Sequence, residues 1–337
     1  MRRAVAAAIV AGVLGLAAGV GVSTRPRATA AGPAAGPVAG SVAGDAAGGA
    51  APSGPPFAVG VEQVTFVDRS RTVKLPGRPP KPRTLTTVVR YPAQGAPGHL
   101  DLRDAPADRA AGPFPLIVFG HGFAVTPATY YRLLRAWAQA GYVVAAPVFP
   151  RENAHAPGGP DESDLVNQPR DMSVVISGVL AAARARGGRL DGLIDSRRVA
   201  VSGQSDGGET ALAVAYDRFY RDPRVRAAVI LSGAQIPGAG TLVPGPALLA
   251  AQGTADTINE PRNTYAFFGA ARRPKYLLRL LGAPHLPPYT GEEPQLAIVE
   301  RVSEAFLDYY LKGARDGLTR MARAGDRRGV STLEARP

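Results

Sequence analysis

The chain has 337 residues, no cysteine and a formal net charge of +12. A chain of this length can bury a sizeable core, and without cysteine it must fold by core packing alone, with no disulfide bond. Only four of its 39 basic residues are lysine. No basic stretch is interleaved with aromatic residues, and this argues against nucleic-acid binding despite the positive net charge. The charge predicts instead a diffuse basic surface that could associate weakly with an anionic envelope.

The first segment has the pattern of an export signal. Residues 1–3 are positively charged, residues 4–22 form an uncharged run, and residues 28–30 are small enough for cleavage. An uncleaved membrane anchor is the alternative, but the many Ala and Gly residues of the run disfavour it. Residues 1–30 are therefore predicted to be a signal peptide of a secreted protein. Residues 31–56, nearly all Ala, Gly, Pro, Val and Ser, are predicted to be a linker.

The predicted domain, residues 57–312, opens with two strands over residues 59–67 and 84–91. The connection between them, residues 68–83, is rich in Arg, Lys, Gly and Pro. We expect it to be a basic surface loop.

A strand, a helix and a strand follow over residues 116–119, 128–140 and 142–148, the spacing of a right-handed parallel unit. The first strand is wholly apolar and runs into a Gly-His-Gly-Phe turn. This turn places the backbone N–H of Phe123 at the strand end, where a donor to an oxyanion is needed. For His121, a structural role in pinning the loop is favoured over acid–base catalysis.

Residues 149–166 form a long irregular loop on the rim of the predicted site, and we expect it to influence substrate choice. His155 and nearby acids suggest a metal, but their spacing is not that of a metal motif, and a solvated loop is favoured. A helix is predicted over residues 167–186, where apolar residues recur at steps of three and four before a Gly-Gly stop.

The sequence Gly203-Gln204-Ser205-Asp206-Gly207 connects an apolar strand to an Ala- and Leu-rich helix. A Gly-x-Ser-x-Gly motif in this context is typical of a nucleophile elbow, in which the turn is so tight that both glycines must lack a Cβ. Ser205 is predicted to be the nucleophile, with the backbone N–H of Asp206 as an oxyanion donor. An ordinary glycine-rich loop is the alternative.

A serine nucleophile needs a base and an orienting acid. Of the four histidines only His285 follows Ser205, in a turn-rich loop after a predicted strand. Asp256 is the favoured acid because it too follows a predicted strand. The other acids available between the two residues are Asp206, Glu209, Asp217, Asp222 and Glu260.

The remaining elements continue the alternation. Strands are predicted over residues 226–231, 246–251 and 276–281, and helices over residues 261–271 and 293–311. Residues 313–337 carry six arginines and no clear apolar stripe, so they are predicted to be a frayed basic tail.

This order of elements, with Gly120-His121-Gly122-Phe123, the elbow at Ser205, then Asp256 and His285, resembles the α/β-hydrolase fold. Within it the chain is similar to the secreted dienelactone-hydrolase-like group, related to chlorophyllases, platelet-activating-factor-acetylhydrolase-like proteins and polyester hydrolases. The resemblance implies a mostly parallel sheet with helices on both faces and no large cap domain. Gln204 and Asp206 depart from the His and Met usual in polyester hydrolases, and dienelactone hydrolases proper use a cysteine nucleophile.

The implied activity is hydrolysis of a small-molecule, lipid or polymer ester through a Ser205, His285 and Asp256 triad, with no metal or organic cofactor. An acyltransferase or amidase on the same triad is one alternative, separable by whether an alcohol acceptor outcompetes water. A catalytically silent envelope-binding protein is another, and failure to react with a fluorophosphonate would favour it.

Overall fold

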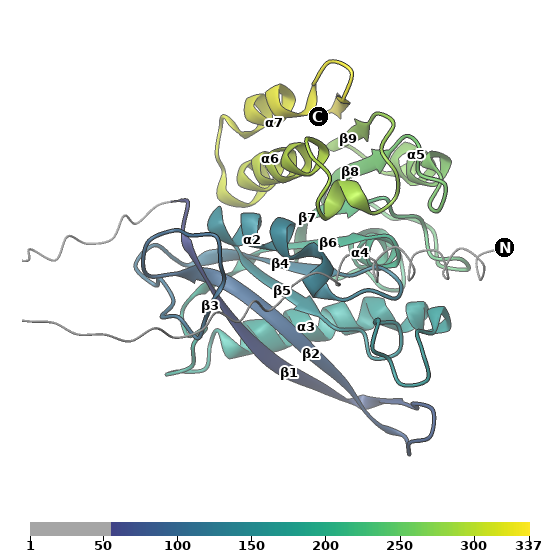
Figure 1. Cartoon of the computed structure of the whole chain (residues 1–337). Coiled ribbons are helices and arrows are strands. Elements are labelled where there is room, and N and C mark those ends of the chain that lie inside the picture. The colour runs from purple at the N-terminus through teal and green to yellow at the C-terminus, as the bar shows by residue number, and fades with distance from the viewer. Residues whose placement is uncertain (1–54) are drawn as a thin grey trace, which may run out of the picture. The chain divides into compact units, whose positions relative to one another are not determined.

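A ten-stranded mixed sheet organises residues 55–337, the part of the chain that the computed structural model describes (Figure 1). The spatial order is β10-β9-β8-β7-β6-β4-β5-β2-β1-β3. Six adjacent strands run parallel, in the order β9, β8, β7, β6, β4 and β5. On either side of them, β10 and β2 run antiparallel. The strands are β1 (Ala58–Val73), β2 (Lys81–Ala93), β3 (Leu102–Arg103), β4 (Phe114–Gly120), β5 (Val143–Pro147), β6 (Ile194–Gln204), β7 (Val225–Leu231), β8 (Ala247–Gly253), β9 (Lys275–Leu280) and β10 (Ser331–Arg336).

Helices cover both faces of the sheet, as Figure 1 shows for α3 on one side and α2 and α6 on the other. The first core contains side chains of α3, α4 and α5, and the second contains side chains of α2, α6 and α7. This arrangement confirms the predicted fold class. The helices are α2 (Tyr131–Gln139), α3 (Gln168–Ala182), α4 (Asp206–Tyr216), α5 (Pro261–Ala270), α6 (Gln295–Leu307) and α7 (Gly317–Gly325), with short turns η1 (Pro127–Tyr130), η2 (Glu162–Asn167), η3 (Pro287–Tyr289) and η4 (Asp308–Lys312).

The central strands are buried along their whole length, because helices lie against both faces. Each parallel strand ends at the same edge of the sheet, and loops from β4, β5, β6, β8 and β9 leave there. That edge is where the predicted site residues should meet.

The predicted signal peptide, residues 1–30, lies outside the described residues, as does nearly all of the predicted linker. Within residues 55–337, no helix is both long and apolar enough to cross a bilayer.

The expected surface loop over residues 68–83 is wrong. The two first strands continue far beyond the core as a β-hairpin, pairing as far as Val73 with Lys81, and only residues 74–80 form the loop (Figure 1). Two arginines of this segment join the hairpin to the domain: Arg83 is buried against Asp164 and Asp171, and Arg71 also contacts Asp171. The other basic side chains of the segment are exposed.

The expected frayed tail over residues 313–337 is also wrong, and the domain extends past residue 312. Helix α7 packs Met321 into the second core, and β10 pairs with the edge of β9 from Ser331 opposite Leu280 to Arg336 opposite Lys275. The helix has nine residues and the strand six, too few to show a long apolar stripe. Leu333 of β10 packs against the same core.

Candidate active site

Ser205 stands in a sharp turn between the end of β6 and the start of α4, with φ 57° and ψ −125°. A non-glycine residue at positive φ is strained, and a nucleophile elbow stores this kind of strain. A Cβ on Gly203 would lie 2.0 Å from the carbonyl oxygen of Gly207, and one on Gly207 would lie 2.0 Å from that of Gly120. Both positions therefore require glycine, as the sequence indicates, although Gly207 is constrained by β4 rather than by Gly203.

Ser205, His285 and Asp256 are hydrogen-bonded in series. The Ser205 Oγ lies 2.8 Å from His285 Nε2, and His285 Nδ1 lies 2.7 Å from Asp256 Oδ2. All three residues are at least nine-tenths buried. A hydroxyl, an imidazole and a carboxylate in this order form an arrangement in which the imidazole can take the hydroxyl proton while the carboxylate orients the ring.

Asp256 is held by more than the histidine. Its Oδ1 accepts the backbone N–H groups of Ile258 and Asn259 at 2.9 and 3.0 Å, and its Oδ2 accepts Gln252 Nε2 at 3.2 Å. These bonds fix the carboxylate near the start of the loop between β8 and α5. Two of the alternative acids have other partners: Asp222 pairs with Arg224, and Glu260 pairs with Arg262.

The loop after β4 lies directly against the serine. A Cβ on Gly122 would come within 3.1 Å of the Ser205 Cβ, so a larger residue would crowd the serine side chain. Among residues 55–337, neither the Phe123 N–H nor the Asp206 N–H donates to another group. Both amides thus remain available donors beside Ser205, and their role in binding an oxyanion stays a prediction.

Two comparisons relate this chain to known proteins. A family model described as chlorophyllase matches residues 101–232, a span that includes Ser205 but ends before Asp256. No curated protein matches the sequence. A solved ferulic acid esterase from Streptomyces cinnamoneus superposes with a TM-score of 0.56 at 23% identity, covering 76% of this chain and 91% of that one. The chain has the α/β-hydrolase fold.

Gln204 and Tyr130 also belong to the candidate site, and neither role is predicted from the sequence. The Tyr130 hydroxyl donates to Gln204 Oε1 at 2.7 Å and accepts the N–H of Gly122 at 3.2 Å. Gln204 Nε2 donates to the backbone carbonyl of His285 at 3.1 Å. The pair therefore connects the loop after β4 to the loop that carries the imidazole. The position of Gln204 beside the nucleophile was the available signal.

His121 has the structural role expected of it. The ring is fully buried, its Nε2 accepts the N–H of Phe149 at 3.0 Å, and its Nδ1 lies 2.8 Å from the carbonyl of Gly122. Because Nε2 accepts, the proton must be on Nδ1, which donates to Gly122. Burial lowers the pKa of His121 to about 4, so the ring is neutral near pH 7.

The rim loop between β5 and α3 is only partly solvated. His155 is exposed, in keeping with a solvated loop, whereas Glu152 and Asp164 are buried. Gly158 of this loop is close enough to Pro76 of the hairpin that a Cβ would lie 2.5 Å from the Pro76 ring. The hairpin tip therefore packs on the rim.

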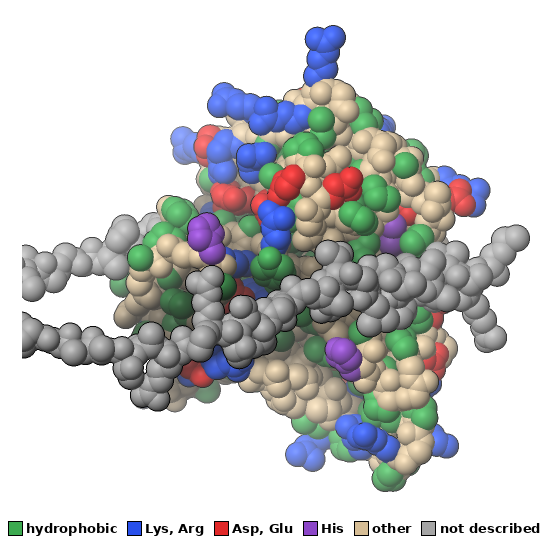
Figure 2. Space-filling model, viewed as in Figure 1, with side chains coloured by type: hydrophobic (Ala, Val, Ile, Leu, Met, Phe, Trp, Pro, Cys, Tyr) green, Lys and Arg blue, Asp and Glu red, His purple; other side chains and the backbone are tan. Residues whose placement is uncertain are grey.

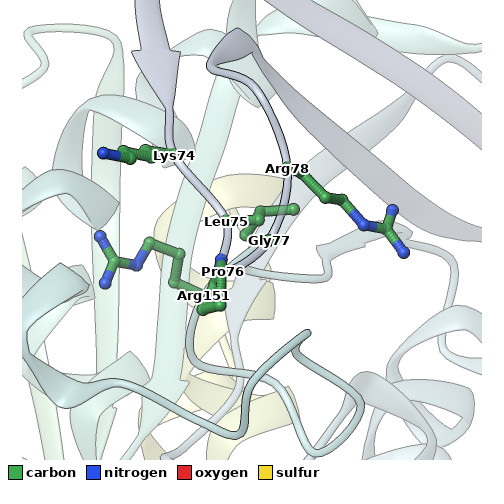
Figure 3. A pocket seen from close by; sticks show the side chains of 6 residues that line it. All are labelled: Lys74, Leu75, Pro76, Gly77, Arg78 and Arg151. Atoms are coloured by element: carbon green, nitrogen blue, oxygen red, sulfur yellow. The ribbon is translucent and has the colours of Figure 1, made fainter.

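A separate pocket of about 470 Å³ lies between that hairpin tip and the rim loop. Figure 3 shows its lining, in which Lys74 and Arg151 extend to one side and Arg78 to the other. Figure 2 shows Lys and Arg side chains gathered at this end of the visible face and again over α7. None of Ser205, Asp256 and His285 lines the pocket, so we do not assign the reaction to it.

Proposed function

We propose that this α/β-hydrolase is a secreted serine esterase that cleaves carboxylic esters through an acyl-enzyme. The observation that carries the proposal is the unbroken series of hydrogen bonds from Ser205 Oγ through His285 to Asp256, at 2.8 and 2.7 Å. The fold shared with an esterase and the match to the chlorophyllase model support it. Export through residues 1–30 is part of the same proposal.

In the first step, Ser205 Oγ attacks the ester carbonyl carbon while His285 Nε2 takes the hydroxyl proton. Asp256 holds the proton on His285 Nδ1, which leaves Nε2 free to act as the base, and it stabilises the imidazolium that forms. The tetrahedral oxyanion accepts hydrogen bonds from the N–H groups of Phe123 and Asp206.

The intermediate then collapses. The carbon–oxygen bond to the alcohol breaks, and the imidazolium gives its proton to the departing oxygen. Water enters, His285 removes one of its protons, and attack on the acyl-enzyme releases the acid and restores Ser205. The position of Asp206 at the start of α4 also directs the helix dipole toward the developing negative charge.

The substrate class is open among small-molecule, lipid and polymer esters. The structural neighbour is named a ferulic acid esterase, so aryl carboxylic esters belong in the first screen. That screen compares p-nitrophenyl esters of graded chain length, a feruloyl ester and polyester films.

Ser205→Ala should lower ester hydrolysis by about 10⁴-fold or more without unfolding the protein, because the side chain is at an elbow tip and contributes little packing. Asp256→Asn should cost roughly 10²- to 10⁴-fold, since it leaves the ring in the wrong tautomer. The measurement is kcat/KM on the best ester of the screen, with circular dichroism as the folding control. Labelling by a fluorophosphonate should disappear in Ser205→Ala and be slowed in Asp256→Asn, which impairs the base that activates Ser205.

Wild-type activity in purified Ser205→Ala would remove the assignment. If Asp256→Asn keeps nearly full activity while Asp222→Asn loses it, the orienting acid is Asp222. The assignments of Ser205 and His285 would stand.

A further inference from the structure

Glu152 is a buried acid to which the proposed mechanism gives no role. It lies in the rim loop after β5, and its side chain has no exposed surface. Neither of its carboxyl oxygens has a hydrogen-bond donor among residues 55–337, and Oδ2 of Asp206, the acid that acts on it, is likewise buried without a donor. A carboxylate so placed is costly, because burial removes it from bulk solvent and no protein donor compensates for the lost hydration.

The groups around Glu152 make a negative charge there still less favourable. Burial raises the pKa of Glu152 well above its usual range, and hydrogen bonding and charge from Asp206 on α4 raise it further, as do the charges of Asp164 and Glu162 on η2. Two nearby arginines have other partners: Arg83 of β2 pairs with Asp164 and Asp171, and Arg151 pairs with Asp161.

Glu152 also joins the two halves of the predicted oxyanion hole. Its backbone carbonyl accepts the N–H of Ala124 at 2.9 Å, and Ala124 has a strained φ of 56° directly after Phe123. Its side chain faces Asp206, the residue whose N–H is the other donor. One residue thus contacts the segments that carry both amides.

We propose that Glu152 is a positioning residue: its protonated carboxyl shares a proton with the Asp206 carboxylate, and this pair holds the Phe123 and Asp206 amides in the geometry that binds the oxyanion. Loss of the proton to solvent at alkaline pH leaves two carboxylates in contact beside the developing negative charge. The pair then separates, and transition-state stabilisation falls.

The kinetic test rests on the proposed esterase activity and compares pH profiles of kcat. The kcat of the wild-type protein should decline at alkaline pH. The amide of Glu152→Gln can still donate to Asp206, so at neutral pH its kcat should be within about threefold of the wild-type value, and it should show no alkaline decline. Glu152→Leu cannot donate a hydrogen bond to Asp206. At every pH its kcat should be about tenfold below the neutral-pH value of the wild-type protein, and its KM should change less than its kcat. Glu162→Gln removes a neighbouring charge that raises the pKa of Glu152 but leaves the Glu152–Asp206 pair intact, so it should retain the alkaline decline, moved to lower pH.

A second measurement needs no activity. Infrared spectra at the pH of highest stability should show the C=O stretch of a protonated carboxylic acid that Glu152→Gln removes and that shifts in Asp206→Asn. Burial raises the pKa of Glu300 to about 7, so all spectra are taken in a Glu300→Gln background to remove that acid.

Absence of the acid band overturns the proposal, and so does an alkaline decline that persists unchanged in folded Glu152→Gln. A wild-type protein that hydrolyses no ester but shows the band would instead contradict only the esterase assignment.

Discussion

At the scale of single residues, this fold keeps several ionisable side chains neutral by burying them, and His121 is the case with the best-defined geometry. Its pKa of about 4 in the folded protein is below the ordinary histidine value near 6.5. Between about pH 4 and pH 6.5 the unfolded chain therefore binds more protons at this residue than the folded protein does. The neutral ring of His121 contributes fully to the free energy of unfolding above about pH 6.5, and this contribution is lost as the pH falls toward 4.

The loss should approach about 3 kcal/mol, given 1.36 kcal/mol for each unit of pKa difference. His121→Gln removes the titration while keeping a donor for Gly122 and an acceptor for Phe149. Chemical denaturation from pH 4 to pH 8 should show that wild-type stability falls more steeply with acid than that of His121→Gln. Parallel curves for the two proteins would mean that His121 does not titrate in this window.

At the scale of elements, the β1–β2 hairpin is fastened to the rest of the domain by buried charges. Arg83 contacts Asp164 of η2 and Asp171 of α3, each at 2.6 Å, and all three side chains are almost fully buried. Burial alone would lower the pKa of Arg83, but hydrogen bonds to the two carboxylates raise it. Arg71 adds a second contact to Asp171 at 2.7 Å.

Arg83→Met should lower the free energy of unfolding by about 3 to 5 kcal/mol, because it leaves two carboxylates buried without their main partner. Adding Asp164→Asn and Asp171→Asn should restore part of the loss, since the uncompensated charge is then gone. Arg132→Met is the matched control: it breaks a half-exposed pair with Glu293 and should cost less than about 1 kcal/mol. A loss for Arg83→Met no larger than that of the control would contradict a structural role for the network.

At the scale of the whole molecule, the sequence predicts best what one strand or helix determines by itself, and the fold class is confirmed. Ser205, Asp256 and His285 are indicated as a candidate site because each follows an apolar strand, and parallel strands end at one edge of a sheet. Their catalytic roles stay a prediction. Glu152 and Gln204 could not be chosen that way, because their burial depends on segments distant in the chain. The tail was misjudged for the same reason: α7 and β10 are short, and their partners are α6 and β9.

Contacts between segments distant in the chain also define where the domain begins and ends. The series of hydrogen bonds from Ser205 through His285 to Asp256 is complete within residues 55–337, and Phe57 begins the core with its N–H bonded to the carbonyl of Gln139 at 2.8 Å. A chain that starts at Pro55 should therefore have the kcat/KM and unfolding midpoint of the chain that starts at Ala31. A chain that ends at Lys312 loses β10 from the edge of β9 and the Met321 side chain from the core, so it exposes a strand edge and apolar surface.

We expect that shortened chain to aggregate or to unfold at a clearly lower denaturant concentration. A chain ending at Asp326, which keeps α7 but lacks β10, should fall between the two. Guanidinium unfolding of the three proteins, with light scattering to detect aggregates, makes the comparison. An unchanged midpoint after removal of residues 313–337 would show that the C-terminal helix and strand are dispensable additions, and would return the domain boundary to residue 312.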